Sequence, residues 1–309
     1  MKSYTLLAAA AGLSILPSAL AHSLLVGVII NGKNYHGYDP RPGAVNPADR
    51  VGWLTTAEDQ GYVSALNYST PDIVCHRGGK SPVAHAPVRA GDKVHVQWNG
   101  WPAGHQGPVI SYVAPCKSTK GDGCTSADKN TLSWTKIENG EPGLFNPLTS
   151  PPPGDWASNH LANNNNSWLV GIPTGLKPGP YVLRHEIIAL HFAAELGGAQ
   201  NYPLCINLWV EAPAPGVPVK PFNLAAGIPA TKMYKSTDPG ILIDIYKTQT
   251  TSYVIPGPTV APNANPVPVT AQTISASTAD GVPVVVASGT KTVPFAQPTA
   301  VVRRYPRTF

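Results

Sequence analysis

The sequence has few charged residues, and they are not gathered by sign. Asp, Glu, Lys and Arg make up 13% of its 309 residues, and the formal net charge is +5. Much of the excess lies after residue 256, in Lys291, Arg303, Arg304 and Arg307 against Asp280. Because a nucleic-acid-binding protein gathers lysine and arginine on one face of its fold, this near-neutral balance argues against a nucleic-acid partner and fits an uncharged one.

Long apolar runs are also missing. A membrane-spanning helix needs about 20 apolar residues, and nothing after residue 21 approaches that length. The shorter run Leu6 to Leu16 follows Lys2 and precedes Ala19-Leu20-Ala21, the small-x-small triplet that a signal peptidase accepts. We therefore expect residues 1–21 to be a signal peptide cleaved before His22, and the protein to be a soluble extracellular monomer without a membrane partner.

The motifs of common hydrolases are absent. Glu138, Glu141, Asp155 and Glu195 are scattered with no pattern that selects a catalytic carboxylate pair. The sequence also has no serine-nucleophile elbow. A hydrolase that works without metal or reductant is therefore only a minor alternative.

Helical periodicity is almost absent, whereas strand periodicity is clear. Apolar and polar residues alternate over 93–98, 181–191 and 205–210, and 34 prolines and 29 glycines separate such segments. This pattern predicts an all-β, antiparallel, immunoglobulin- or fibronectin-like β-sandwich with long loops and little helix. The stretch 140–166, with three successive prolines and four successive asparagines, is expected to be a surface loop.

The four cysteines, Cys75, Cys116, Cys124 and Cys205, predict two disulfides in an exported chain. Four cysteines allow three pairings. Cys116 and Cys124 flank a short loop, which favours their pairing and leaves Cys75 to Cys205. A cysteine metal site is a weak alternative, because no C-x-x-C spacing occurs.

From residue 257 the composition changes to proline, valine, alanine and threonine with no cysteine. We predict a catalytic domain over 22–256 and a flexible extension over 257–309, without a disulfide-stapled binding module. Asn67 and Asn165 begin N-x-S sequences and are candidate glycosylation sites of a secreted protein.

His22 would become the amino terminus after cleavage. Its free α-amine and its own imidazole Nδ1 can then close a ring around a metal ion, which no internal histidine can do. A terminal histidine can also arise by chance, so the hypothesis needs further ligand candidates downstream.

His105 is the second ligand candidate, in a Gly-His-Gln-Gly-Pro loop that would hold the imidazole away from the sheet. Gln200 and Tyr202 project to the same side of an extended backbone, so a phenol and an amide can lie near such a metal. His185 and His191 also share one side of a predicted strand. Taken singly, each has an ordinary alternative: a solvated loop histidine, or a buried strand aromatic.

Several ordered motifs resemble one known family. They are His22 itself, GHQGP around His105, LRHEIIALH ending at His191, GAQNYPLCINLWV beginning at Gly198, and STDPGILIDIY ending at Tyr246, followed by SYVIPGP. Together they resemble the fungal lytic polysaccharide monooxygenases of auxiliary-activity family 9, over residues 22 to about 258.

The resemblance implies one copper held by the amine and Nδ1 of His22 and by Nε2 of His105, with Tyr202 axial. His191 and Gln200 would be the outer pair at the open position. Imidazole and amine donors suit copper. The implied activity is oxidative cleavage of β-1,4-glucan such as cellulose at C1 and/or C4, with O2 or H2O2 and an external electron donor.

The implied substrate surface is flat, and Tyr246 would stack on a sugar there. The loop 39–52 carries no aromatic residue, although relatives have tyrosines in it. A different class of function remains open: a non-catalytic secreted β-sandwich that only binds copper or glycans. Such a binder would have no need of Gln200 and His191 beside an open metal position.

Overall fold

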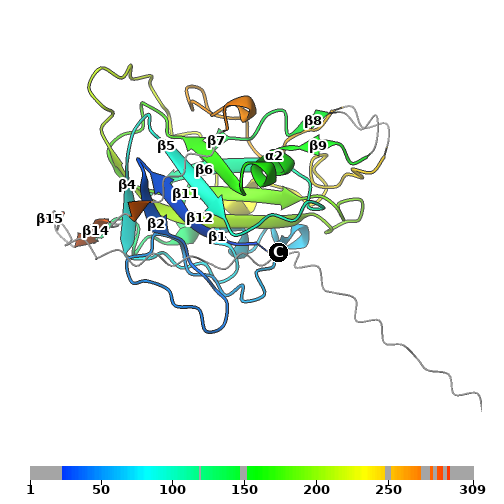
Figure 1. The fold of residues 1–309 in the computed structure, drawn as a ribbon, viewed down its shortest axis with the longest axis horizontal. Helices are drawn as coiled ribbons and strands as arrows, with labels where there is room; N and C mark the ends of the chain where they lie inside the picture. Colours follow the sequence, from blue (N-terminus) through cyan, green and yellow to red (C-terminus); the bar gives the residue numbers. More distant parts are fainter. Residues whose placement is uncertain are drawn as a thin grey trace, which may run out of the picture.

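The computed structural model describes residues 23–117, 120–146, 152–247 and 252–272, together with the short strand segments 279–280, 284–287 and 291–292. His22, the predicted signal peptide and most of the chain after residue 272 lie outside the described residues. Two β-sheets pack face to face, and long loops surround them (Figure 1). The predicted β-sandwich with little helix is therefore confirmed.

The first sheet has the order β10-β5-β1-β2-β13. Its strands are β1 (Leu25–Ile30), β2 (Lys33–His36), β5 (Lys93–Trp98), β10 (Ser167–Gly171) and β13 (Ala279–Asp280). All of its pairs are antiparallel except β13 with β2.

The second sheet has the order β15-β14-β4-β12-β11-β6-β7, and β3 pairs with β12. Its strands are β3 (Val63–Ser64), β4 (Ala84–Arg89), β6 (Val109–Pro115), β7 (Thr135–Glu138), β11 (Gly179–Ala189), β12 (Gln200–Glu211), β14 (Val284–Ala287) and β15 (Lys291–Thr292). The pair β12–β4 is parallel, and its other pairs are antiparallel.

The remaining elements are short. They are the hairpin β8 (Leu144–Asn146) and β9 (Asp155–Trp156), the helices α1 (Asp72–Cys75) and α2 (Ala157–Asn163), and the 3-10 turns η1 (Ala65–Asn67), η2 (Lys129–Thr131), η3 (Ala230–Lys232) and η4 (Val269–Ala271). The stretch 140–166, expected to be a loop, thus contains β8, β9 and α2. No helix among the described residues is both long and apolar enough to cross a membrane.

The side chains of β11 alternate between two faces of the sheet, and both faces are buried. Leu183, Ile187 and Ala189 point into the core between the two sheets, whereas Val182 and Ile188 point into a second core under the loops. Because loops cover the outer face of this sheet, no strand position from Tyr181 to Ala189 is exposed. The polar residues of that outer face must therefore find partners inside the protein.

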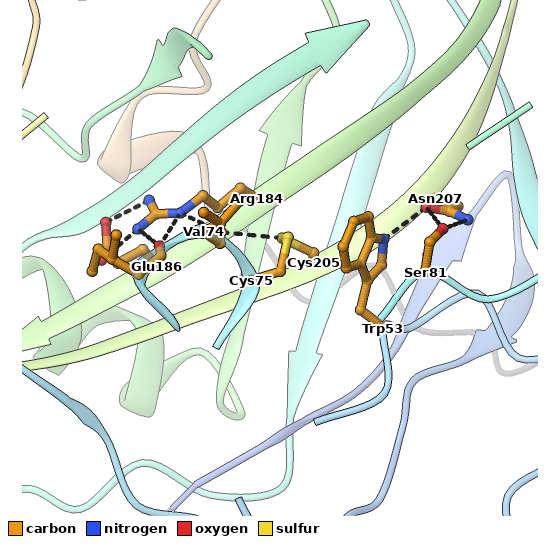
Figure 2. Close-up of a disulfide and its surroundings, with 9 residues drawn as sticks. Trp53, Val74, Cys75, Ser81, Arg184, Glu186, Cys205 and Asn207 are labelled. Carbon is orange, nitrogen blue, oxygen red and sulfur yellow. Dashed lines mark hydrogen bonds and ion pairs between the residues drawn. A yellow bond between two sulfur atoms is a disulfide. The ribbon is translucent and has the colours of Figure 1, made fainter. Parts of the chain in front are cut away.

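Arg184 and Glu186 form a fully buried ion pair on this outer face (Figure 2). The guanidinium donates to both carboxylate oxygens of Glu186, at 2.7 and 2.9 Å, and to the carbonyls of Ile73 and Val74 in α1. Glu186 also accepts from Asn201 Nδ2 at 2.7 Å and from the Tyr234 hydroxyl. The pair therefore joins β11, β12, α1 and the 230s loop.

The two disulfides pair as the sequence analysis favoured. Cys75 at the end of α1 is bonded to Cys205 in β12, and Cys116 is bonded to Cys124. The first bond lies beside the Arg184 network, where Val74 O accepts from Arg184 Nε (Figure 2). Disulfide and ion pair thus hold α1 on the same part of the second sheet.

The packed part of the chain continues beyond the boundary at residue 256 that the composition suggested. Lys136 of edge strand β7 donates through Nζ to Pro256 O and accepts through its carbonyl from Ala261 N. The side chain of Gln272 pairs with both backbone groups of Leu169 on edge strand β10. Residues 257–272 therefore cover edges of both sheets, which is one way proteins protect such edges.

Glu138 lies where this segment crosses β7. Its buried carboxylate accepts from the N–H groups of Asn139 and Gly140 through one oxygen and from Val267 N through the other, at 2.9–3.0 Å. Burial raises the pKa of Glu138 to about 7, although the backbone donors oppose this rise. The carboxyl group thus couples protonation to the docking of the C-terminal segment.

We predict that Glu186→Ala lowers the free energy of unfolding by about 3–5 kcal/mol, because it leaves a buried guanidinium without its carboxylate. The exposed pair Arg89–Glu211, with 3.8 Å between its charged atoms, provides the control. Glu211→Ala should cost less than about 1 kcal/mol. Urea denaturation of both variants measures the difference, and equal costs would contradict the assigned role of the buried pair.

A second prediction concerns pH. The folded protein keeps the Glu138 proton up to about pH 7, whereas the unfolded chain releases it near the ordinary value of 4.5, so unfolding releases a proton between these values. Stability should therefore fall as pH rises from 4.5 to 7, by on the order of 1–3 kcal/mol more in the wild type than in Glu138→Gln. Denaturation at a series of pH values tests this, with the exposed Glu58→Gln expected to retain the wild-type slope.

Candidate active site

Strand register brings the predicted site residues together at one end of the sandwich. In the pairing of β6 with β11, Val109 lies opposite Ile187, and in that of β11 with β12, Ile187 lies opposite Tyr202. Gln200 lies opposite Ala189 in the next row. Because side chains alternate along strands, Gln200 and Tyr202 share the face that points between the two sheets.

The Gly-His-Gln-Gly-Pro loop continues the pairing of β6 with β11 past the strand ends. Leu190 N donates to Gln106 O at 2.8 Å and Ile188 N to Pro108 O at 3.2 Å, which places His105 beside His191. Gly107 allows this approach, since a Cβ there would lie 1.8 Å from Ile188 O. The glycine in this motif is therefore a packing requirement of the site.

The two imidazoles are in contact. The ring centroids of His105 and His191 are 4.0 Å apart with an interplanar angle of 39°. His105 is buried, at 8% exposure, and His191 is half-buried. Burial lowers the pKa of His191, which favours the neutral ring, and its Nδ1 has no hydrogen-bond partner among the residues that the structure describes.

Tyr202 and Gln200 form a pair of their own. The Tyr202 hydroxyl donates to Gln200 Oε1 at 3.1 Å, and both side chains are buried. Burial raises the pKa of Tyr202, so the phenol keeps its proton at physiological pH. Asn201 between them donates to Glu186, so the buried ion pair fixes the backbone that presents both residues.

Trp101 supports the site from inside the sandwich and was not predicted from the sequence. Its ring is perpendicular to those of Tyr202 and His105, at 5.1 and 6.0 Å between centroids. Its Nε1 donates to His105 O at 2.9 Å, which fixes the loop backbone. Trp98 packs on its other side and on His185, which bonds to Ser111. The signal was two tryptophans, Trp98 at the end of β5 and Trp101 just before the His105 motif.

The start of the described chain is attached to the same loop. Asn99 Oδ1 accepts from Ser23 Oγ and from Leu24 N, each at 2.9 Å, and Asn99 N donates to Leu24 O at 3.0 Å. Asn99 directly follows β5 and precedes Trp101. The chain next to His22 is therefore held on the loop that carries His105.

The other predicted residues are exposed. Tyr246 is 49% exposed, and its backbone N–H is bound by Asp244 Oδ1. Asn67 and Asn165 are exposed as well, so both remain candidate glycosylation sites. Sequence reasoning missed two exposed aromatic rings that contact the site: Tyr62 against Tyr202, and Phe192 against His191.

Among the described residues, no group of three or more His, Cys, Asp or Glu side chains could hold a metal ion. They include the His105 imidazole, a second imidazole in contact with it, and the Tyr202 phenol, which packs on the same Trp101 ring as His105. Imidazole is a good ligand for copper. The attached chain start leads to His22, which would add an amine and another imidazole after the predicted cleavage. This donor set fits copper.

Comparison with known proteins decides the family. The model of Auxiliary Activity family 9 (formerly GH61) matches residues 22–253. The chain belongs to this family. A family 9 lytic polysaccharide monooxygenase from Thermoascus aurantiacus is 49% identical over 239 residues, covering 77% of this chain and 98% of the relative. One from Emericella nidulans is 44% identical over 275 residues, covering 88% and 94%.

Solved structures of family members agree. The extended catalytic domain of a lytic polysaccharide monooxygenase from H. jecorina is 40% identical, with a TM-score of 0.67, and covers 88% of this chain and 100% of that one. A cellulose-active polysaccharide monooxygenase from M. thermophila is 30% identical, with a TM-score of 0.62, and covers 77% and 98%. The family 9 chain is accordingly an oxidoreductase that acts on polysaccharide.

We predict that Asn99→Ala loosens residues 23–24 on the His105 loop while the sandwich stays folded. Both bonds to the Asn99 side chain are lost, and the backbone bond from Asn99 N to Leu24 O remains. Loss of the hydrogen bond at Leu24 N should make exchange of that amide about fivefold to tenfold faster, as measured by hydrogen-exchange NMR. Gln60→Ala is the matched control, because Gln60 contacts only the Nδ2 side of Asn99. Unchanged Leu24 exchange in Asn99→Ala would contradict this attachment.

Proposed function

We propose that the chain is a secreted, copper-dependent lytic polysaccharide monooxygenase that cleaves β-1,4-glucan such as cellulose at C1 and/or C4, using O2 or H2O2 and an external electron donor. The observation that carries the proposal is the convergence of His105, His191, Gln200 and Tyr202 at one end of the sandwich. The attached chain start points to His22 as the residue that completes the site.

In this proposal, the amine and Nδ1 of His22 and Nε2 of His105 would hold the copper, with the Tyr202 phenol beside it. Bound there, copper would supply the one-electron chemistry by which O2 or H2O2 is activated. Trp101 holds the His105 loop through its hydrogen bond to His105 O, and Asn99 holds the chain next to His22. The protein thus orients the donors in advance, so less ordering is needed when metal binds.

His191 and Gln200 would orient the small oxidant beside the metal. The Nδ1 atom of His191 has no partner among the described residues, and Gln200 Oε1 is held by the Tyr202 hydroxyl. A neutral imidazole and an amide can each donate or accept a hydrogen bond to oxygen. Because Gln200 is held at its oxygen, its amide nitrogen is left to donate toward the site.

Tyr246 is half exposed, and its backbone N–H is bound by Asp244 Oδ1. It is the proposed sugar-stacking residue. The M. thermophila relative is described as cellulose-active, which supports a glucan substrate. Secretion through residues 1–21, cleavage before His22 and glycosylation at Asn67 and Asn165 complete the proposal.

The decisive test is His105→Ala in the secreted protein. Copper affinity should fall more than about a hundredfold, since even an outer residue of a metal site contributes 10–100-fold, and release of oxidised oligosaccharides with ascorbate should stop. Isothermal titration calorimetry and mass spectrometry of the products measure the two effects. His36→Ala, a histidine on β2, should change neither.

The alternative is a non-catalytic binder of copper or glycans. It would retain copper binding but would consume no peroxide and oxidise no polysaccharide when loaded and reduced. That result in the wild-type protein would replace the proposed activity with the binder. Activity that survives EDTA, without reductant, would instead identify a hydrolase.

A further inference from the structure

Phe192 is an exposed aromatic ring in contact with the site. Its side chain is 62% exposed, and its ring centroid lies 4.4 Å from that of His191, which in turn contacts His105. An apolar ring left open to water costs solvation free energy, and a contiguous exposed apolar patch often marks a binding surface. Phe192 therefore extends the site outward on the His191 side.

The turn that carries Phe192 is firmly held. Leu190 and Ala193 on either side of it are buried, at 1% and 0% exposure. Phe192 O accepts from Glu195 N, and Gly198 packs so closely that a Cβ there would lie 1.8 Å from Phe192 O. The exposed ring is thus presented by an ordered backbone rather than by a frayed loop.

The same turn is joined to the segment that carries Tyr246. Ile243 N donates to Ala193 O at 2.8 Å, and Ile241 and Ile245 of that segment are buried. Phe192 directly precedes the accepting residue, and Tyr246 follows the donating residue by three positions. The two exposed rings are therefore carried by directly hydrogen-bonded turns, one of which follows His191.

We propose that Phe192 contacts the substrate, with its ring face stacked on one glucosyl residue of a β-1,4-glucan chain while Tyr246 contacts another. This proposal rests on the proposed function. A β-glucosyl ring has its hydroxyls around the rim and C–H groups on both faces, so its face is apolar. Phenylalanine has no polar group to place against a rim hydroxyl, which suits it to a sugar face.

Two further exposed apolar side chains lie on or against the surface turn that carries Phe192. Leu196, at 58% exposure, follows Phe192 on the same turn, and Leu66, at 62%, packs against Gly197.

The test measures binding of copper-free protein to insoluble cellulose by depletion from solution, so that the readout does not depend on the metal. Phe192→Ala should bind about fivefold to tenfold more weakly, because it no longer buries the apolar area of one ring face against the sugar. Phe192→Tyr keeps the flat ring and should retain wild-type affinity. Phe192→Leu keeps an apolar side chain without the flat face and should bind like Phe192→Ala.

Val219→Ala is the matched control. Val219 is 60% exposed, in the loop after β12 whose Lys220 N–H bonds to Thr174, at the opposite end of the sheet from His191. It should bind as the wild type does. Affinity of Phe192→Ala within twofold of the wild type, or wild-type affinity of Phe192→Leu, would overturn the stacking role.

Failure of this inference can be separated from failure of the proposed function. If the wild type releases oxidised oligosaccharides but Phe192→Ala binds normally, only the stacking role is wrong. If the wild type releases none but Phe192→Ala and Phe192→Leu lose binding, the stacking role holds for a glucan binder.

Discussion

The buried ion pair between Arg184 and Glu186 is the interaction on which the site geometry depends. It lies on the outer face of the second sheet and holds α1, the Tyr234 loop and Asn201. Asn201 separates Gln200 from Tyr202, so fixing its side chain on one face of β12 fixes theirs on the other. A buried pair stabilises a protein little compared with apolar packing, so its structural value here is the single arrangement that it imposes on four segments.

The site lies where the pairing of β11 with β12 ends and the pairing of β6 with β11 continues into the His105 loop. Close approach of the His105 loop to β11, which only a glycine at 107 permits, sets His105 against His191. Trp101 packs behind this contact and reaches Tyr202 as well. The first sheet contributes through Asn99, which directly follows β5 and holds the chain next to His22. The residues of the candidate site thus depend on segments of both sheets and meet at one end of the sandwich.

The sequence was sufficient for the local strand pattern, and the structure brings His105, His191, Gln200 and Tyr202 to one end of the sandwich. Period-two alternation predicted strands at 93–98, 181–191 and 205–210, which the structure places at Lys93–Trp98, Gly179–Ala189 and Gln200–Glu211. It did not reveal the roles of Trp101 and Asn99 or the docking of residues 257–272, because these depend on partners far away in the sequence. Composition alone suggested an unstructured tail. The residues that bond to this segment are Lys136, Glu138 and Leu169, which lie far from it in the sequence.

The proposed stacking of exposed rings would let the protein bind an uncharged, insoluble polymer without relying on charge pairs. Charge would be matched only by a charged ligand, whereas sugar faces offer apolar area at regular spacing along the chain. Each stacked ring adds a modest binding free energy, and rings on separate rigid turns select an extended chain because both must be covered at once. The hydrogen bond between Ile243 and Ala193 fixes the turns of Phe192 and Tyr246 relative to each other, so the spacing is set by backbone structure rather than by side-chain flexibility.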